Sequence, residues 1–258
     1  MRTANIGCAR FIGTRRTPPP LRVLLCHGGA LLLFACALPA IAAPPPTPNA
    51  DPVFPFSREI EAFAKANSAG PPARDATLFL GSSSIRLWDI AGSFHDISTI
   101  NRGFGGATTA HVLHYYKRLL PALPPRSVVI YVGENDLAAG ITPEAVTRDI
   151  LTLIGKLRAD YPRAPIAYLS LKPSPLRWVL RPKMAQVNTA IAQRAQVDGF
   201  AYLDVEHVLL AADGLPDASL FRPDGLHMNA RGYQRWTSLV DAWLDRVAPQ
   251  QSMAESRF

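Results

Sequence analysis

Residues 127–136 of this 258-residue chain read Ser-Val-Val-Ile-Tyr-Val-Gly-Glu-Asn-Asp, an apolar, β-branched run that ends in a polar turn. A short run of this kind, bounded by turn residues, is typical of a strand buried on both faces of a sheet. Similar runs occur at residues 77–80, 97–100, 166–171 and 200–205. We therefore expect about five buried strands, and their burial favours a parallel sheet.

Helical patterns separate these runs. Residues 144–158 follow a Thr142-Pro143 start signal and place their apolar side chains on one helical face. Residues 183–197 and 230–247 show similar spacing. Strands that alternate with helices in this way predict an α/β fold, with helices on both faces of the sheet. Ligands of such sheets bind at the carboxyl ends of the strands, so we expect the chemistry in the loops that follow them.

The first 42 residues have the pattern of an export leader. Basic residues are followed by an apolar run at 23–37 and by the small-x-small pattern Ala40-Ile41-Ala42, which is typical of a signal peptide cleaved after Ala42. The apolar run is shorter than the roughly 20 residues that a membrane span needs. We expect an exported protein, periplasmic or secreted. An uncleaved anchor, a lipoprotein acylated at Cys36 and twin-arginine export remain open.

This leader accounts for most of the unusual composition of the chain. It holds five of the 27 basic residues, none of the 20 acidic residues and all three cysteines. Its removal leaves 22 basic residues and a net charge of +2 in place of +7. The pI near 9.6 therefore does not indicate a nucleic-acid partner. A mature chain without cysteine has no disulfide, no thiolate nucleophile and no cysteine metal ligand.

The rest of the chain divides into three parts. Residues 43–56 are a proline-rich linker, with six prolines from Pro44 to Pro55. Residues 57–248 form one domain that contains all the predicted strands, and residues 249–258 are a C-terminal tail. We expect no stable membrane span after leader cleavage.

Polar or glycine-rich segments follow three of the predicted strands, at residues 81–84, 101–106 and 133–136. Taken singly, each has an ordinary explanation as a helix N-cap, a glycine turn or an Asn-Asp turn. A fourth segment brings Asp224 and His227 three residues apart, where one helix-like turn would put both side chains on the same face. Such a pair makes two members of a nucleophilic triad, and the serines of residues 81–84 offer the third.

In their order along the chain, these four segments closely resemble the four sequence blocks of the SGNH (GDSL-type) esterases and lipases. The resemblance covers residues 75–245 and includes the flanking segments 171–175 and 227–233. It implies a three-layer α/β/α sandwich on a five-stranded parallel sheet with flavodoxin-like topology. It also implies a serine hydrolase of carboxylic esters that needs no cofactor and no metal.

Carried over position by position, the resemblance makes Ser83 the nucleophile, His227 the general base and Asp224 the acid that orients it. A serine hydroxyl needs a base to accept its proton, and histidine suits that role near neutral pH. The implied oxyanion hole consists of the backbone N–H groups of Ser83 and Gly106 and the side-chain amide of Asn135.

One position departs from the family pattern, because Ser82 stands where the first block usually has aspartate. That aspartate is not a triad member, so we expect altered loop hydrogen bonding and retained activity. Three consecutive serines also leave Ser84 as an alternative nucleophile, although alignment on residues 79–81 favours Ser83. The nucleophile elbow of classical α/β-hydrolases is not predicted, since Ile85 stands where that motif needs glycine.

Other functions fit the same residues. An acyltransferase or deacetylase acting on cell-envelope glycans would use the same acyl-enzyme, and a non-catalytic envelope module would keep the scaffold alone. A metal centre on Asp224 and His227 is possible in principle, whereas His111 and His114 have no evident third ligand. The substrate is expected to be a small-molecule, lipid or glycan acyl ester, and neither its acyl length nor the oligomeric state is predicted. Residues 172–178 either line the substrate rim or form a proline-stiffened surface loop.

Overall fold

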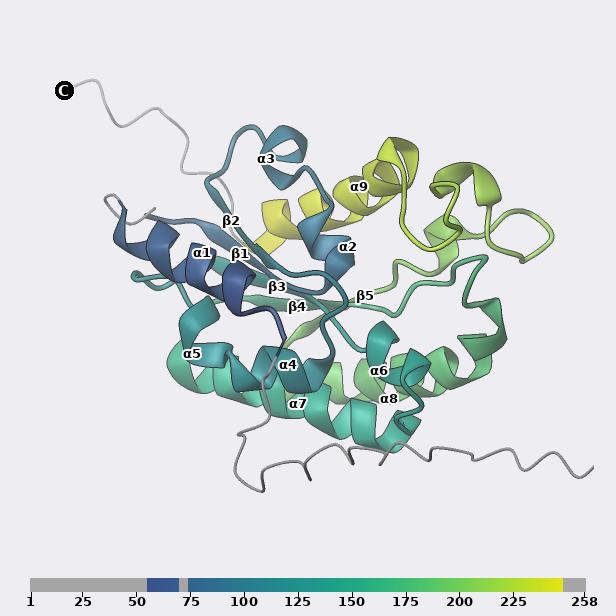
Figure 1. Cartoon of the computed structure of the whole chain (residues 1–258), viewed down its shortest axis with the longest axis horizontal. Helices are drawn as coiled ribbons and strands as arrows, with labels where there is room; N and C mark the ends of the chain where they lie inside the picture. Colours follow the sequence, from purple (N-terminus) through teal and green to yellow (C-terminus); the bar gives the residue numbers. More distant parts are fainter. Residues whose placement is uncertain (1–54, 70–73, 248–258) are drawn as a thin grey trace, which may run out of the picture. The chain divides into compact units, whose positions relative to one another are not determined.

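The computed structural model describes residues 55–69 and 74–247, and these residues form a five-stranded parallel sheet with helices on both faces (Figure 1). Its strands lie in the order β2-β1-β3-β4-β5. The predicted α/β/α fold with flavodoxin-like strand order is confirmed. The strands are β1 (Thr77–Gly81), β2 (Thr99–Gly103), β3 (Ser127–Tyr131), β4 (Ile166–Leu169) and β5 (Ala201–Leu203).

Several predicted segments lie outside the described residues: the leader at 1–42, all but the last two residues of the linker at 43–56, and the tail at 249–258. Within the described part of the chain, no helix is both long and apolar enough to cross a membrane.

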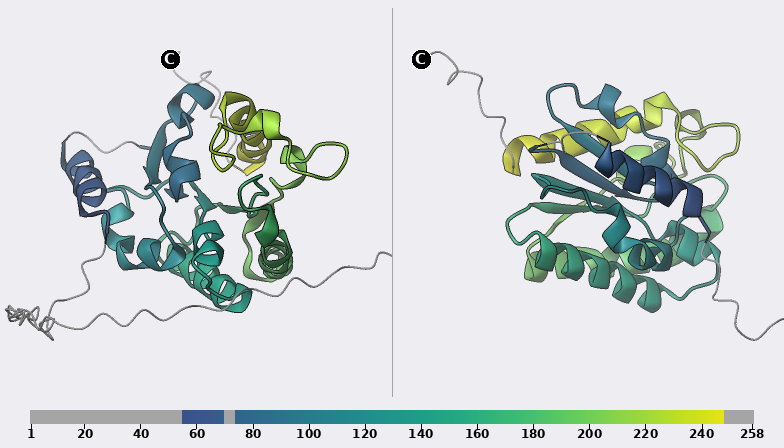
Figure 2. Two further views of the ribbon diagram at one scale, coloured as in Figure 1. Left: turned by 45° about the vertical axis from the view of Figure 1, so that its right-hand side comes forward. Right: turned by 60° about the vertical axis from the view of Figure 1, so that its left-hand side comes forward.

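The helices form a layer on each face of the sheet, as the right-hand view of Figure 2 shows. One layer contains α1 (Ser57–Ser68), α4 (Thr109–His114), α5 (Tyr116–Leu119), α7 (Pro143–Asp160) and α8 (Arg181–Asp198). The other contains α2 (Ser83–Arg86), α3 (Ile90–Ser93) and α9 (Ala230–Val247). The remaining short elements are α6 (Glu134–Ala138) and the 3-10 turns η1 (Trp178–Leu180), η2 (His207–Leu209) and η3 (Ala218–Leu220).

Strand residues alternate between two apolar cores. Leu78 and Leu80 of β1 pack in the core on the α7 and α8 side, whereas Phe79 between them packs in the core beneath α9. Successive side chains of a strand point to opposite faces, so a strand that is apolar at every position needs a helical layer on each side. The continuous apolar runs in the sequence therefore follow from the three-layer arrangement.

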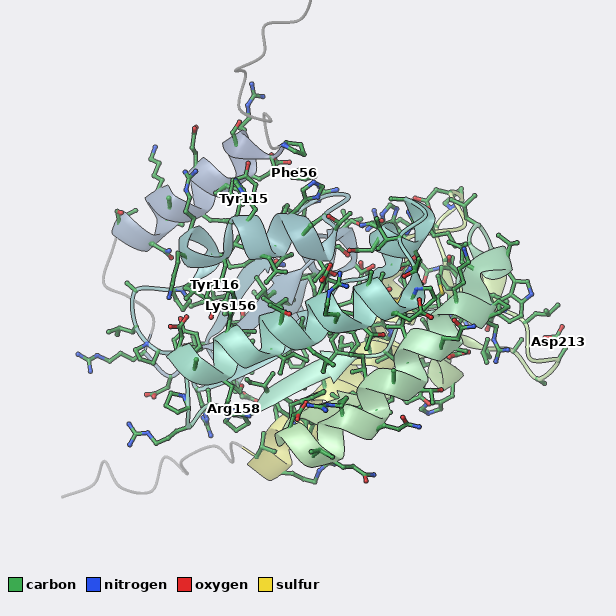
Figure 3. The ribbon with its side chains drawn as sticks, turned by 90° about the horizontal axis from the view of Figure 1, so that it is seen from below. Phe56, Tyr115, Tyr116, Lys156, Arg158 and Asp213 are labelled. Carbon is green, nitrogen blue, oxygen red and sulfur yellow. The ribbon has the colours of Figure 1, made fainter. Side chains whose placement is uncertain are left out.

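The long helices agree with the sequence prediction. The pattern at 230–247 matches α9, while 144–158 and 183–197 lie within α7 and α8. Figure 3 shows α7 and α8 side by side on one face, with Arg158 near the end of α7. Arg158 donates hydrogen bonds to the carbonyl oxygens of Ala164 and Gly199, which precede β4 and β5. These contacts hold the segments that lead into β4 and β5, at the amino-terminal ends of the strands and opposite the predicted site.

The predicted boundaries of the second strand were wrong. Residues 97–100 were expected, but β2 spans Thr99–Gly103, so Asn101 belongs to the strand and not to the loop after it. The Asn101 side chain donates to the Ile85 carbonyl and accepts the Gly103 N–H, each at 2.9 Å. β2 is an edge strand, and its polar end is held by side-chain hydrogen bonds that an apolar pattern does not reveal.

Candidate active site

Three strand ends meet at one edge of the sheet. β1 leads into α2, β2 into the loop at 104–108 and β3 into α6, and β1 lies between the other two strands. The chain runs outward from β1 to β2 and then back past β1 to β3, which makes a switch point of the kind where open α/β sheets bind ligands. Figure 1 shows α2 and α6 at the same end of the sheet, on opposite faces.

The end of β1 exposes one serine of the three. At Gly81 the backbone has φ 154°, and an added Cβ would lie 1.9 Å from the Tyr131 carbonyl oxygen, so only glycine fits. The chain then enters α2 with Ser83 as its first residue. Ser82 and Ser84 are each 3% exposed, whereas Ser83 is partly open to solvent. The accessible hydroxyl of this segment is therefore that of Ser83.

His227 approaches Ser83 from the loop before α9. Its Nε2 lies 3.1 Å from Ser83 Oγ, and its Nδ1 lies 2.8 Å from Asp224 Oδ2. The other carboxylate oxygen accepts the backbone N–H groups of Leu226 and His227, each at 2.9 Å. These hydrogen bonds, that of the His227 ring first, hold the pKa of Asp224 well below its ordinary value. The structure thus brings the three predicted triad residues into one hydrogen-bonded chain.

Asp224 and His227 lie in a closed turn, not in the helix-like turn that was predicted. An antiparallel bridge joins Phe221 to Met228, and the Arg222 N–H donates to the His227 carbonyl at 2.7 Å. Between them Gly225 takes a left-handed conformation with φ 64°, which glycine adopts without strain. The bridge fixes both ends of the turn, so the ring of His227 is oriented by backbone contacts as well as by its acid.

The other predicted donors come from the loops after β2 and β3. Gly106 has φ 73°, a left-handed conformation that favours glycine. No described atom lies within 4 Å of an added Cβ, so the preference for glycine comes from the backbone conformation and not from a lack of space. Asn135, the second residue of α6, donates from Nδ2 to the Ala107 carbonyl at 2.9 Å. That bond joins the two loops and leaves the second amide N–H for another acceptor. The Ser83 N–H lies in the first turn of α2, where intrahelical acceptors are lacking.

A buried ionic cluster beside Asn135 was missed in the sequence. The Glu134 side chain is only 4% exposed, and its Oε2 lies 2.8 Å from Lys172 Nζ. The guanidinium of Arg177 lies 3.1 Å from Oε1, and the Tyr131 hydroxyl donates to Oε2. Burial acts to raise the pKa of Glu134, but the charges of Lys172 and Arg177 outweigh it and lower that pKa. The sequence did contain a signal for this cluster, because Glu134 and Lys172, which carry opposite charges, each follow a predicted strand.

This cluster also settles the nature of the segment at 172–178. Lys172 and Ser174 are completely buried. The alternative of a plain surface loop is therefore wrong for the first half of the segment, while Leu176 is exposed.

Two other histidines, His111 and His207, make local contacts. The His111 ring bonds with Thr108 in a capping box at the start of α4, and no group of three metal-ligating side chains occurs among the described residues. His207 lies 3.4 Å from Asp204. That pair repeats the three-residue spacing of the site, but both of its side chains are more than half exposed.

Comparisons with known proteins identify relatives of this chain. A family model described as GDSL-like Lipase/Acylhydrolase family matches residues 85–235, which contain Gly106, Asn135, Asp224 and His227. Platelet-activating factor acetylhydrolase IB subunit alpha2 from Rattus norvegicus and from Homo sapiens is 30% identical over 170 residues, covering 61% of this chain and 71% of each relative. A GDSL-like lipase structure from Bacteroides thetaiotaomicron superposes with a TM-score of 0.63 at 18% identity, covering 72% of this chain and 97% of that one.

Proposed function

The chain belongs to the GDSL-like lipase/acylhydrolase family and is an ester-hydrolysing enzyme, and from that premise we propose that it cleaves carboxylic esters through an acyl-enzyme on Ser83. The observation that carries this proposal is the chain of contacts from Ser83 Oγ through the His227 ring to Asp224, at 3.1 and 2.8 Å. A serine whose hydroxyl meets an acid-oriented imidazole is an activated nucleophile.

The proposed reaction has two halves. His227 Nε2 takes the proton of Ser83 Oγ as that oxygen attacks the ester carbonyl, and the oxyanion accepts hydrogen bonds from the N–H groups of Ser83 and Gly106 and from Asn135. His227 then returns the proton to the departing alkoxide, which leaves as the alcohol. In the second half a water molecule gives its proton to His227 and attacks the acyl carbon, which releases the acid and restores Ser83.

We further propose a short acyl group and export through the leader at 1–42. The acyl preference rests on the relatives named as acetylhydrolases, and export rests on the leader pattern. A panel of p-nitrophenyl esters from acetyl to palmitoyl tests the substrate class, with a burst of nitrophenol equal to the enzyme concentration as the mark of an acyl-enzyme. Inactivity across the panel would contradict the proposal. Sequencing of the mature N-terminus, expected to begin at Ala43, tests export.

The pH dependence of kcat/KM should show a single ionisation on its acid side. Protonated His227 cannot accept the proton of Ser83, so the rate is low in acid and rises as the ring loses its proton. The lowered pKa of Asp224 keeps its carboxylate charged throughout this rise, and it adds no second step. Measurement of kcat/KM between about pH 5 and pH 9 checks this. A slope of two in the plot of log(kcat/KM) against pH on the acid side, which indicates two protons, would contradict it.

A further inference from the structure

The buried cluster around Glu134 holds more positive than negative charge. One carboxylate lies between the ammonium of Lys172, whose side chain is 1% exposed, and the guanidinium of Arg177, whose side chain is 19% exposed. The Tyr131 hydroxyl is a third partner, and burial raises its pKa, so it stays neutral. Removing charges from water is costly, and a buried ion pair often stabilises a fold no better than apolar residues would. Such a cluster does, however, fix the positions of the groups that form it.

The cluster lies directly behind the proposed oxyanion donor. Glu134 is the first residue of α6 and Asn135 is the second. The amide end of Asn135 is restrained by its hydrogen bond to Ala107. Its backbone end is restrained through Glu134, whose side chain cannot move without breaking contacts to Lys172, Arg177 and Tyr131.

The segment that supplies both cations is itself anchored in the site. The Leu176 N–H donates to the Gly225 carbonyl at 2.9 Å, and the Arg177 N–H donates to the Ser174 carbonyl at 3.2 Å. Gly225 lies between Asp224 and His227 in the acid–base turn. The guanidinium of Arg177 is therefore delivered to Glu134 from a segment fixed against the opposite side of the site.

We propose that Glu134 is a positioning residue of the esterase reaction, which acts through Asn135 and is held in place by Lys172 and Arg177. This inference rests on the proposed function, since it assigns the support of a donor in that mechanism. Small displacements of a catalytic group cost large factors in rate: about 1 Å of misplacement costs on the order of 100-fold. An oxyanion donor needs this precision because its bond strengthens only at the transition state.

Arg177 is the best position for a test. Glu134→Gln would leave Lys172 buried without a counter-charge, and that variant is at risk of not folding. Arg177→Gln keeps the Glu134–Lys172 pair and removes only the partly exposed cation. We expect kcat for p-nitrophenyl acetate to fall by about 10- to 100-fold, with KM changed less than about threefold because ground-state binding is not affected. Titration of the active sites with a phosphonate ester normalises each rate to folded enzyme.

Two further variants make the result specific. Arg177→Lys keeps the positive charge and should recover a large part of the lost kcat. Arg181→Gln is the matched control, because Arg181 lies four residues further on and pairs with Glu206 at 3.0 Å, not with Glu134. Its kcat should equal that of the unchanged enzyme. A lowered melting temperature for Arg177→Gln, with an unchanged kcat per titrated site, would mean a purely structural role and would overturn the proposal.

A double-mutant cycle with Asn135→Ala tests the route of the effect. Asn135→Ala alone should lower kcat by on the order of 10²–10³, the usual loss for one oxyanion donor. If Arg177 acts through Asn135, adding Arg177→Gln to Asn135→Ala should cost little more, whereas independent effects would multiply and contradict the proposal. Ser83→Ala, measured in the same assay, distinguishes failure of the positioning role from failure of the proposed function. If Ser83→Ala is inactive and Arg177→Gln is fully active, only the positioning role fails; if Ser83→Ala is active, the proposed acyl-enzyme on Ser83 fails.

Discussion

Ser83→Ala is expected to lower kcat/KM for p-nitrophenyl acetate by on the order of 10⁴–10⁶, the range found when a triad member is removed. Alanine has no oxygen to attack the ester, so no acyl-enzyme forms and the burst of nitrophenol disappears with the steady-state rate. The fold should persist, because Ser83 is partly exposed and its hydroxyl meets the His227 ring, not the apolar core. The rate, the burst and the melting temperature measured on one preparation check all three expectations.

Ser84→Ala is the matched control for this experiment. It removes the same hydroxyl from the adjacent residue of α2, where the side chain is 3% exposed. The Tyr233 hydroxyl donates to the backbone carbonyl of Ser84, which alanine keeps. We expect Ser84→Ala to stay within a few-fold of full activity. Loss of activity in Ser84→Ala with retention in Ser83→Ala would move the nucleophile by one residue.

Asp224→Asn is expected to lower kcat by about 10⁴-fold, with a smaller change in KM. The amide oxygen can still accept the N–H groups of Leu226 and His227, so the turn should keep its shape. The amide nitrogen, however, would donate to Nδ1 of His227 and place the ring proton on Nε2. That tautomer cannot accept the proton of Ser83. Steady-state kinetics, together with an unchanged circular dichroism spectrum, check this prediction.

The chain offers a matched control for the loss of this acid. Asp204 and His207 have the same residue types and the same three-residue spacing as Asp224 and His227, with a contact of 3.4 Å. Asp204→Asn should leave kcat unchanged, because the serine beside this pair, Ser170, donates its hydroxyl to the Asp204 carboxylate and not to the His207 ring. Equal losses in both variants would show that removing an Asp–His pair acts through general stability.

The sequence predicted those parts of the fold that depend on local periodicity. Apolar runs identified β1 and β3 because both faces of these strands are buried, and the pattern at 230–247 gave the bounds of α9. The polar end of β2 was missed because the Asn101 side chain is held by two hydrogen bonds. One goes to the Ile85 carbonyl in another segment, and the other comes from the Gly103 N–H. Periodicity carries no record of such contacts.

The site was predictable for a different reason. Parallel strands end at a common edge, so residues after β1, β2 and β3 must lie together once the sheet order is known. The Glu134–Lys172 pair follows from the same rule, since β3 and β4 are neighbours. It was missed because a glutamate beside Asn135 and a lysine after β4 each look like solvent-exposed charges, and their burial depends on how the segment at 172–178 folds back. The closed turn around Gly225 depends on that same packing.

The proposed nucleophile and base are separated by 144 positions in the chain. No fragment that stops before His227 contains a complete site, even if it carries Ser83, Gly106 and Asn135 in a partly formed sheet. Closing so long a segment is among the slower steps of folding, because its entropy cost comes before its contacts form. Reaction of Ser83 with a phosphonate ester would therefore report the last stage of folding, because it requires that His227 has already reached Ser83. A newly made chain should be translated past His227, and largely compact, before it can hydrolyse an ester.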